Sequence, residues 1–187
     1  MRGHSPRSTI LNPNLKRGDA SMKVVVLSDT HIPVRAKDLP KRVLEELETA
    51  DAIIHAGDFE EWAVAERLKE FAPLYAVCGN MDWEEVRVNL PERRIVTLSG
   101  QKIAIVHGWG APHDLPERVR TLFEDEEGLS CIVFGHSHRP FNNQVRGVLC
   151  FNPGSPTDSY FSPYLSFGIL SVDEEGVRGK IIAIEGG

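Results

Sequence analysis

The alternation of apolar and polar stretches in the first half of the chain predicts a repeated strand–helix order. The predicted strands span residues 24–27, 51–58 and 74–78. Pro40 stands where a helix start tolerates proline. Val43, Leu44 and Leu47 lie on one face of the helix that follows, and a second helix ends before Pro73. This order is the signature of a parallel sheet with crossover helices.

The second half of the chain changes to a pattern of hairpins. Ser99-Gly100 is a two-residue turn between predicted strands over residues 94–98 and 102–106. A helix is predicted over residues 115–123, and further strands over residues 131–134, 144–145, 148–151, 165–172 and 177–184. The acidic residues 124–127 are interpreted as a solvated turn, because they lack the alternating ligand spacing of a calcium site. Two sheets packed face to face, with helices outside, fit this order.

The chain is expected to hold one folded domain over residues 22–187, with no internal repeat. Residues 1–21 are polar and lack the apolar central region of a secretory signal. Met22-Lys23 would open the first strand directly. We therefore expect residues 1–21 to be a disordered leader or the product of a misassigned start site.

The composition is that of an ordinary globular protein. The chain has 187 residues, of which 41% are hydrophobic and 26% charged, and no apolar run approaches the roughly 20 residues of a membrane helix. The net charge of −6 argues against an extended nucleic-acid surface. Cys78, Cys131 and Cys150 lie in or beside apolar runs, which favours reduced thiols and a cytoplasmic location.

Polar residues with nitrogen and oxygen ligands follow several of the predicted strands. Asp29 and His31 come after the first strand, and residues two apart at a strand end point the same way. The same pattern recurs at Gly57-Asp58, Gly79-Asn80, His107-Gly108 and Gly135-His136-Ser137-His138. The neighbouring glycines let backbone segments come close together. Seven candidate metal ligands thus lie in five loops.

Three other histidines are not assigned to this set. His55 lies inside an apolar run, and the strand alternation turns it away from the Asp58 loop, so it is interpreted as structural. His4 falls in the leader and His113 in a loop, and neither has a spacing that indicates a metal role.

With these motifs and Asn152-Pro153-Gly154-Ser155, the sequence resembles a calcineurin-like metallophosphoesterase of the small bacterial and archaeal phosphodiesterase branch. The resemblance covers Met22 to the C-terminus and implies an α/β fold, a four-layer αββα sandwich of two mixed sheets. It also implies a two-metal site. One ion would take Asp29, His31, Asp58 and His138; the other would take Asp58, Asn80, His107 and His136, with Asp58 bridging them. We expect Asp58, Asn80 and His107 to carry the catalytic role.

The ligand types agree with this chemistry. Mixed imidazole and carboxylate ligands favour divalent transition metals, with Mn expected first and Ni, Fe, Co or Zn as alternatives. The set contains no thiolate, which argues against a purely structural zinc site. Two ions roughly 3.5–4 Å apart can share a hydroxide that attacks a phosphoryl group in line. No covalent intermediate is then needed.

Charge counting favours a phosphodiester substrate. Two divalent ions bring four positive charges, and Asp29 and Asp58 remove two of them. A hydroxide and a diester monoanion would neutralise the rest, whereas a monoester dianion would overshoot, provided that no nearby Arg or Lys compensates. The expected substrate is therefore a small phosphodiester, with cyclic nucleotides or short nucleic-acid fragments included.

Two positions depart from many relatives. Met81 stands where many of them have a histidine after the asparagine, and a thioether cannot donate a proton. Activated aryl leaving groups should therefore be preferred over alkyl ones, and Asp82 could replace the histidine only if its pKa were raised. Trp109 replaces another histidine, and it either lines the substrate pocket or packs inside.

Other functions are compatible with the same pattern. A eukaryotic retromer subunit resembles this fold, keeps parts of the motif set and acts mainly as a protein-interaction scaffold. An exposed apolar patch away from the metal loops would favour that role. A phosphomonoesterase or a nuclease domain is a further alternative. Small relatives often form dimers or tetramers, which leaves a homo-oligomer open.

Overall fold

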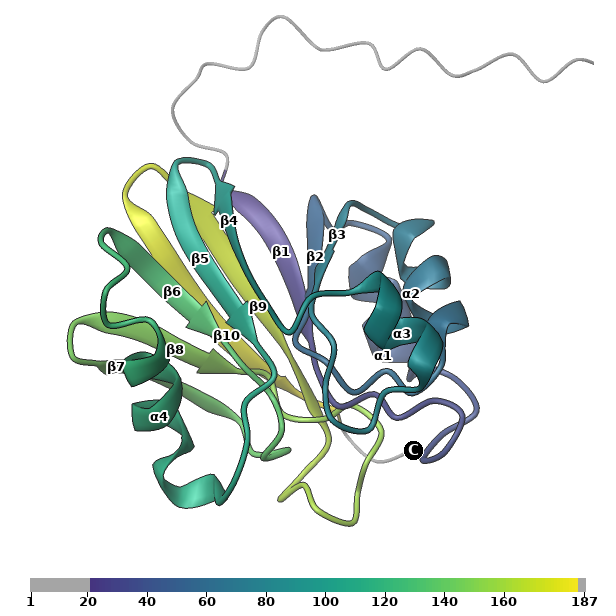
Figure 1. The fold of residues 1–187 in the computed structure, drawn as a ribbon. Coiled ribbons are helices and arrows are strands. Elements are labelled where there is room, and N and C mark those ends of the chain that lie inside the picture. The colour runs from purple at the N-terminus through teal and green to yellow at the C-terminus, as the bar shows by residue number, and fades with distance from the viewer. Residues whose placement is uncertain (1–20, 185–187) are drawn as a thin grey trace, which may run out of the picture.

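The structure is a computed structural model in which residues 21–184 are described. The leader expected over residues 1–21 lies outside the described residues, apart from Ser21. Residues 21–184 form two five-stranded sheets that lie face to face, with helices on both outer sides (Figure 1). Within this part of the chain, no helix is both long enough and apolar enough to cross a membrane. The predicted αββα sandwich is confirmed.

The first sheet has the strand order β10-β9-β1-β2-β3. Its strands are β1 (Met22–Leu27), β2 (Ala52–His55), β3 (Leu74–Ala76), β9 (Ser166–Asp173) and β10 (Gly176–Ala183). Strands β1, β2 and β3 are parallel, as the alternating strand–helix order predicts. The C-terminal hairpin β9–β10 adds two antiparallel strands at the β1 edge, which makes the sheet mixed.

The second sheet has the strand order β4-β5-β6-β8-β7. Its strands are β4 (Arg93–Leu98), β5 (Gln101–Val106), β6 (Leu129–Val133), β7 (Phe141–Val145) and β8 (Val148–Asn152). Ser99 and Gly100 have φ of +45° and +81°, which is the backbone that the predicted two-residue hairpin turn requires. The central strands β5, β6 and β8 are parallel to one another.

The helices cover the two outer faces. They are α1 (Lys41–Leu47), α2 (Trp62–Lys69), α3 (Glu84–Asn89) and α4 (Leu115–Leu122), and a short 3₁₀ turn (Pro112–Asp114) precedes α4. The first three lie on the side of the first sheet, and α4 lies on the second sheet (Figure 1). The acidic residues 124–127 after α4 are exposed in a turn, as predicted.

The alternation of side chains along β1 explains the layers. Val25 and Leu27 belong to the core between the first sheet and its helices. Val24 and Val26 point the other way, into the core between the two sheets, where they join Phe151 of β8. The three valines and the leucine of this run are all fully buried, which is typical of a central strand covered on both faces.

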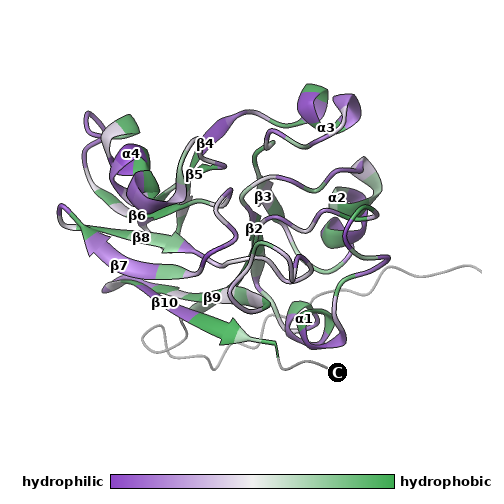
Figure 2. Cartoon of the chain, turned by 90° about the horizontal axis from the view of Figure 1, so that it is seen from below, coloured by the Kyte–Doolittle hydropathy of each residue, from purple (hydrophilic) through white to green (hydrophobic). Residues whose placement is uncertain are grey.

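Parallel strands end at the same edge of a sheet, and this edge gathers the polar loops. The loops after β1, β2 and β3 come from the first sheet, and those after β5, β6 and β8 come from the second. Figure 2 looks onto this end of the molecule and shows apolar positions along the central strands and polar ones in the loops around them.

The structure corrects some element boundaries. Helix α3 was not predicted, because a helix of six residues with Val86 as its buried residue has no apolar period to detect. Strand β7 begins at Phe141 rather than at residue 144, since Asn142 and Asn143 stand on an edge strand where polar side chains are tolerated. Strand β3 ends at Ala76, two residues before Cys78.

Candidate metal centre

Most of the predicted ligands occupy an unusual backbone conformation. Positive φ values occur at Asp29 (54°), His31 (43°), Asp58 (59°), His136 (67°) and His138 (54°). Residues with a Cβ atom adopt this left-handed region rarely, although Asp and His tolerate it better than most. Such conformations cluster where the surrounding fold holds functional groups in place. Here they turn each side chain out of its strand and toward the other loops.

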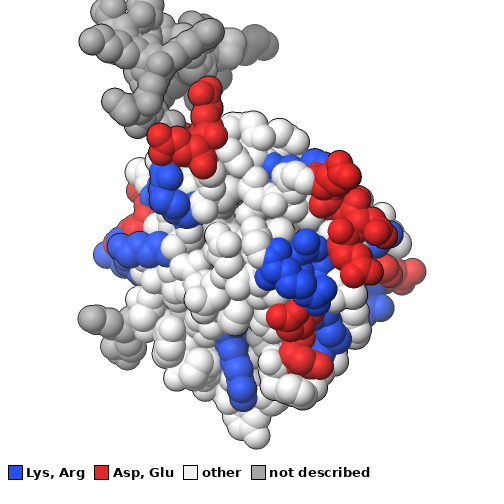
Figure 3. Space-filling view, turned by 90° about the vertical axis from the view of Figure 1, so that its left-hand side faces the viewer, with Lys and Arg blue, Asp and Glu red and all other residues white. Residues whose placement is uncertain are grey.

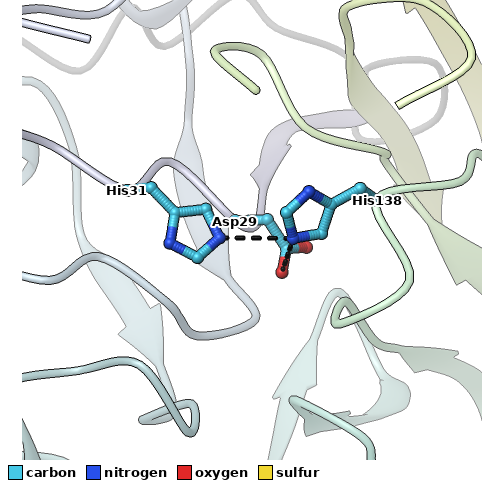
Figure 4. A group of neighbouring side chains, drawn as sticks. All are labelled: Asp29, His31 and His138. Carbon is cyan, nitrogen blue, oxygen red and sulfur yellow. Dashed lines mark hydrogen bonds and ion pairs between the residues drawn. The ribbon is translucent and has the colours of Figure 1, made fainter. Parts of the chain in front are cut away.

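Asp29, His31 and His138 form one close group, although His138 comes from the other sheet (Figure 4). The Nε2 atoms of the two histidines are 3.2 Å apart. His138 Nε2 lies 3.4 Å from Asp29 Oδ1. All three residues are buried, so these ligand atoms converge away from bulk water.

Asp29, Asp58 and His107 form a second close group, which shares Asp29 with the first. His107 Nε2 lies 3.2 Å from Asp58 Oδ2 and 4.0 Å from Asp29 Oδ1. His31 Nε2 approaches the same Asp58 Oδ2 to 3.7 Å. Asp58 Oδ2 thus lies near a histidine of each group, whereas the residue that belongs to both groups is Asp29.

Asn80 and His136 lie at the rim of these groups. Asn80 is exposed, and His136 is half-buried. The His136 ring contacts Asn80 Oδ1 at 3.1 Å and the Gly110 carbonyl oxygen at 3.0 Å. The structure therefore brings together five of the seven predicted ligands closely, and it places these two beside them but facing each other.

Glycines allow the loops to come this close. A Cβ atom on Gly79 would lie 2.1 Å from Asp58 Oδ1. One on Gly135 would lie 1.8 Å from the Ser28 hydroxyl and 2.8 Å from Asp29 Oδ2. Any side chain at either position would displace a candidate ligand.

The Nε2 atoms of His31 and His107 indicate whether a cation fits this site. Glu60 lies 2.8 Å from His31 Nδ1, and the Ala56 carbonyl oxygen lies 2.8 Å from His107 Nδ1. Because these partners take the Nδ1–H groups, the Nε2 atoms carry lone pairs whenever the rings are neutral, as metal binding requires. His107 Nε2 has no hydrogen-bond partner among the described residues. Lone pairs directed at the Asp58 carboxylate repel it unless a cation or proton lies between them, so the residues fit a metal ion.

The pKa values of Asp29 and His107 also indicate that this site attracts positive charge. Burial acts to raise the pKa of Asp29, but the hydrogen bond from His138 and the charge of His107 hold it at about 2. Burial acts to lower the pKa of His107, whereas the Asp58 carboxylate, 3.2 Å from Nε2, and the charge of Asp29 raise it to about 9. The two carboxylates therefore attract positive charge between them, and a metal ion would compete with the proton for His107.

The family follows from comparison with known proteins. The calcineurin-like phosphoesterase superfamily domain matches residues 22–175. The chain belongs to this superfamily. A probable metallophosphoesterase of Methanocaldococcus jannaschii is 37% identical over 166 residues, which cover 88% of this chain and 83% of that protein. The predicted family is thus confirmed.

Two solved structures share the fold of this calcineurin-like chain. A novel archaeal phosphodiesterase has a TM-score of 0.68 and 23% identity, covering 86% of this chain and 100% of that one. Vacuolar Protein Sorting 29 of Chaetomium thermophilum has a TM-score of 0.70 and 21% identity, covering 89% and 97%. At these identities the two likenesses show the calcineurin-like fold alone.

Position 82 of the chain has a structural role. Asp82 is buried, and its carboxylate accepts backbone N–H groups of Gly79 at 2.7 Å, Asp58 at 3.2 Å and Glu60 at 2.8 Å. Burial raises the pKa of Asp82 above its usual value. Its oxygens are nevertheless turned into the protein, so Asp82 joins two ligand loops and does not face a substrate. Met81 is exposed, and its N–H donates to Asp58 Oδ1 at 2.8 Å.

Two carboxylates beside the candidate metal centre were missed in the sequence. Glu60 is 2.8 Å from His31 Nδ1, and Asp158 Oδ2 is 3.1 Å from His138 Nδ1. Both are buried. They follow the Gly57-Asp58 and Asn152–Ser155 motifs by a few residues. That nearness is the only signal in the sequence, because which histidine each one meets depends on the packing of distant loops.

His55 has no free ligand atom, which agrees with its interpretation as structural. Its Nδ1 accepts the Gly57 N–H at 3.2 Å, and its Nε2 contacts the Thr30 hydroxyl at 3.1 Å. Its ring stacks on Phe59 with centroids 3.5 Å apart. Full burial, the largest effect, lowers the pKa of His55 to about 3. His55 is therefore neutral and ties together the loops after β1 and β2.

A cleft of about 550 Å³ opens beside Asn80 and His107. Trp109 lines this cleft and is 47% exposed, which decides its role between pocket lining and internal packing. Charged residues also line it, namely Arg87, Glu92 and Arg93. A molecule bound at the candidate metal centre would thus meet an indole ring and two guanidinium groups on this side.

Proposed function

We propose that this chain is a metal-dependent phosphodiesterase that acts on small phosphodiesters, cyclic nucleotides among them. The observation that carries the proposal is the approach of two buried imidazole nitrogens, those of His107 and His31, to Asp58 Oδ2 at 3.2 and 3.7 Å. Membership of the calcineurin-like superfamily supports the same class of chemistry.

The proposed ligand sets are those expected from the sequence. Asp29, His31, Asp58 and His138 would hold one divalent ion, and Asp58, Asn80, His107 and His136 the other. Two such ions, with Mn the first to test, would supply a hydroxide nucleophile at neutral pH and Lewis-acid polarisation of the phosphoryl oxygens. Rotation of the His136 ring away from Gly110 would be needed for it to join its set, since both its nitrogens are now engaged.

The chain's own groups orient this site. Asp58 Oδ2 faces the histidines while the Met81 N–H holds Oδ1 at 2.8 Å, so the carboxylate has one fixed orientation. The 550 Å³ cleft beside Asn80 offers room for one ester group of the substrate, with Trp109 as an apolar wall.

The charges around the site support a diester preference. Arg87 and Arg93 are near enough to matter, so the condition that no Arg or Lys compensates is not met. Buried Glu60 and Asp158 add two negative charges, however, and Arg35 and Glu92 add one of each sign. The added formal charges are −1 for each of Glu60, Asp158 and Glu92 and +1 for each of Arg35, Arg87 and Arg93, which cancel. The exposed guanidinium groups are screened more than the buried carboxylates, so a monoanion is favoured.

The leaving group is expected to depart without an acid from position 81 or 82. Met81 cannot donate a proton. The carboxylate of Asp82 is occupied by three backbone N–H groups. Activated aryl esters should therefore react faster than alkyl esters.

A protein-interaction scaffold is the second candidate, because Vacuolar Protein Sorting 29 shares the fold. The exposed apolar residues argue for the enzyme. Val34, Met81, Trp83 and Trp109 stand on or just after loops that carry candidate ligands. Tyr160, Phe161 and Tyr164 stand on the loop after β8, where the Phe161 ring meets the His138 ring with centroids 5.8 Å apart. Figure 3 also shows acidic and basic side chains interspersed on one face, with no continuous basic surface there for nucleic acid.

The test is hydrolysis of bis(p-nitrophenyl) phosphate by metal-stripped protein, before and after addition of Mn²⁺. Asp58→Asn serves as the control, because it removes a proposed ligand of both ions. Hydrolysis of p-nitrophenyl phosphate measured alongside separates diester from monoester preference.

Turnover that depends on metal and is lost in Asp58→Asn would support the proposal. A higher kcat/KM on the matched monoester would overturn the diester preference. No turnover with Mn, Ni, Co, Fe or Zn, although metal is bound, would favour the scaffold.

A further inference from the structure

The candidate metal centre has two halves, one with His31 and His138 and the other with His107 and His136. The halves differ in the groups that lie next to the ring nitrogens of their histidines. His31 and His138 each have a buried carboxylate next to Nδ1, at 2.8 Å from Glu60 and at 3.1 Å from Asp158. His107 has a backbone carbonyl oxygen there instead, at 2.8 Å. His136 also meets neutral oxygens, those of Asn80 and Gly110. The carboxylates that lie next to histidine Nδ1 atoms are therefore both on the His31 and His138 side of the centre.

Glu60 is held firmly in this position. It is 4% exposed, and its own N–H donates to Asp82 Oδ1 at 2.8 Å. Its backbone pairs with Ile32, the residue after His31, in an isolated parallel bridge. The loops after β1 and β2 thus fix the carboxylate and the imidazole relative to each other.

Asp158 is held by its other oxygen. Its Oδ1 accepts the N–H groups of Tyr160 at 2.9 Å and Phe161 at 3.3 Å, and its own N–H donates to Ser155 Oγ at 2.9 Å. Asp158 is 1% exposed, and its Oδ2 faces His138 Nδ1. This oxygen has no hydrogen-bond partner of good geometry among the described residues. A small rotation of the His138 ring would complete the pair, with Arg35 Nε 3.4 Å away on the other side.

A carboxylate on the remote nitrogen of a ligand histidine has two effects. It fixes the tautomer that leaves the other nitrogen free, and it makes that nitrogen a stronger donor. Loss of such a partner typically costs 10- to 100-fold in metal affinity. A neutral carbonyl oxygen fixes the tautomer in the same way but adds no full negative charge.

We propose that Glu60 and Asp158 are positioning residues that make the Asp29–His31–His138 half of the centre retain its divalent ion more tightly than the His107 half. This inference rests on the proposed metal-dependent function. It predicts one firmly held ion and one that exchanges with the medium, set by residues that touch neither ion directly.

The experiment follows the metal content of the full chain. Protein loaded with Mn²⁺ is dialysed against rising EDTA, and manganese per chain is measured by mass spectrometry. Wild-type protein should lose its two ions in separate steps. Glu60→Gln and Asp158→Asn should each move the second, tighter step to about 10- to 100-fold less EDTA. Asn80→Ala should move only the first step.

Controls separate positioning from folding. Glu117→Gln removes an exposed carboxylate that pairs with Arg146, and it should move neither step. The visible absorption of Co²⁺-loaded protein should change in Glu60→Gln and Asp158→Asn, because it reports ligand geometry at the ion. The two residues stand on separate loops, so either variant alone suffices if the other does not fold.

Different failures have different meanings. Two ions lost in one step, or a tighter step that neither variant moves, would overturn the inference and leave the phosphodiesterase proposal standing. A wild-type chain that retains no divalent ion at all would overturn both.

Discussion

At the scale of single residues, the site depends on two glycines, because a Cβ atom at either position would overlap with a neighbouring polar group. Gly79 has the Asp58 carboxylate where its Cβ would be, at 2.1 Å. Gly135 has the Ser28 hydroxyl in the same place, at 1.8 Å. Interiors this dense do not yield to an extra methyl group without moving a neighbour. These glycines therefore set the positions of Asp58 and Asp29.

Gly79→Ala is expected to lower hydrolysis of bis(p-nitrophenyl) phosphate by about 100-fold, because it displaces Asp58 by a large fraction of an ångström or more. Gly100→Ala is the matched control. Its φ of +81° makes alanine costly by about 1 kcal/mol, but a Cβ there meets nothing within 4 Å. Equal activity loss in the two variants would contradict the argument.

His55 predicts a measurable pH dependence. In the folded protein burial lowers its pKa to about 3, from 6.5. Between these values the unfolded chain binds a proton that the folded chain does not, so stability is present above about pH 6.5 and is lost as the pH falls. His55→Gln should flatten this decline by up to about 1.4 kcal/mol per pH unit. Urea unfolding of both proteins in the presence of chelator, from pH 7 to 4, measures the free energy of unfolding at each pH. Parallel plots of this free energy against pH would contradict the prediction.

At the scale of elements, the ligand loops are joined by buried polar groups. Asp82, after β3, accepts N–H groups from the loop after β2 as well as from its own loop. His55, at the end of β2, reaches Thr30 in the loop after β1. Each link crosses between neighbouring parallel strands, so the loops form one connected platform at the sheet edge.

Asp82→Ala should destabilise this platform. It leaves the N–H groups of Gly79, Asp58 and Glu60 buried without their acceptor, which should lower the free energy of unfolding by about 3 kcal/mol or more. Asp125→Asn, in the exposed acidic turn, should change it by less than about 0.5 kcal/mol. Guanidinium unfolding monitored by circular dichroism gives both values. A change in Asp82→Ala as small as in the control would show that water replaces the carboxylate.

At the scale of the whole molecule, the candidate metal centre lies at one end of the two sheets and takes residues from loops of both. Asp29, His31 and Asp58 come from loops of the first sheet, and His107 and His138 from loops of the second. The apolar core between the sheets joins them along their length, and the ligands join them at one end. A bound ion would therefore link the two halves of the sandwich.

Metal should raise the melting temperature. An ion that binds the folded chain alone stabilises it by about 2.7 kcal/mol at a concentration 100 times its Kd. Calorimetry of chelator-treated protein with increasing Mn²⁺ should show a rising melting temperature, and Asp58→Asn should respond less. An unchanged melting temperature in wild-type protein that binds manganese would contradict the link between the sheets.

The sequence by itself predicted the layers, the order of most strands and helices, and the candidate ligands. Alternation along residues 24–27 is a local property, and so is the change from an apolar run to Asp29 and His31. The family resemblance then joined the separate motifs into one expected site. These features need no knowledge of which loop touches which.

Only the tertiary structure decided the partners of those ligands. Glu60 meets His31 and Asp158 meets His138 because the strand register and the positive φ values bring their loops together. Asp82 turns inward, and Arg87 and Arg93 line the cleft, for the same reason. Contacts between loops depend on the packing of elements far apart in the chain, and no local pattern of residues encodes them.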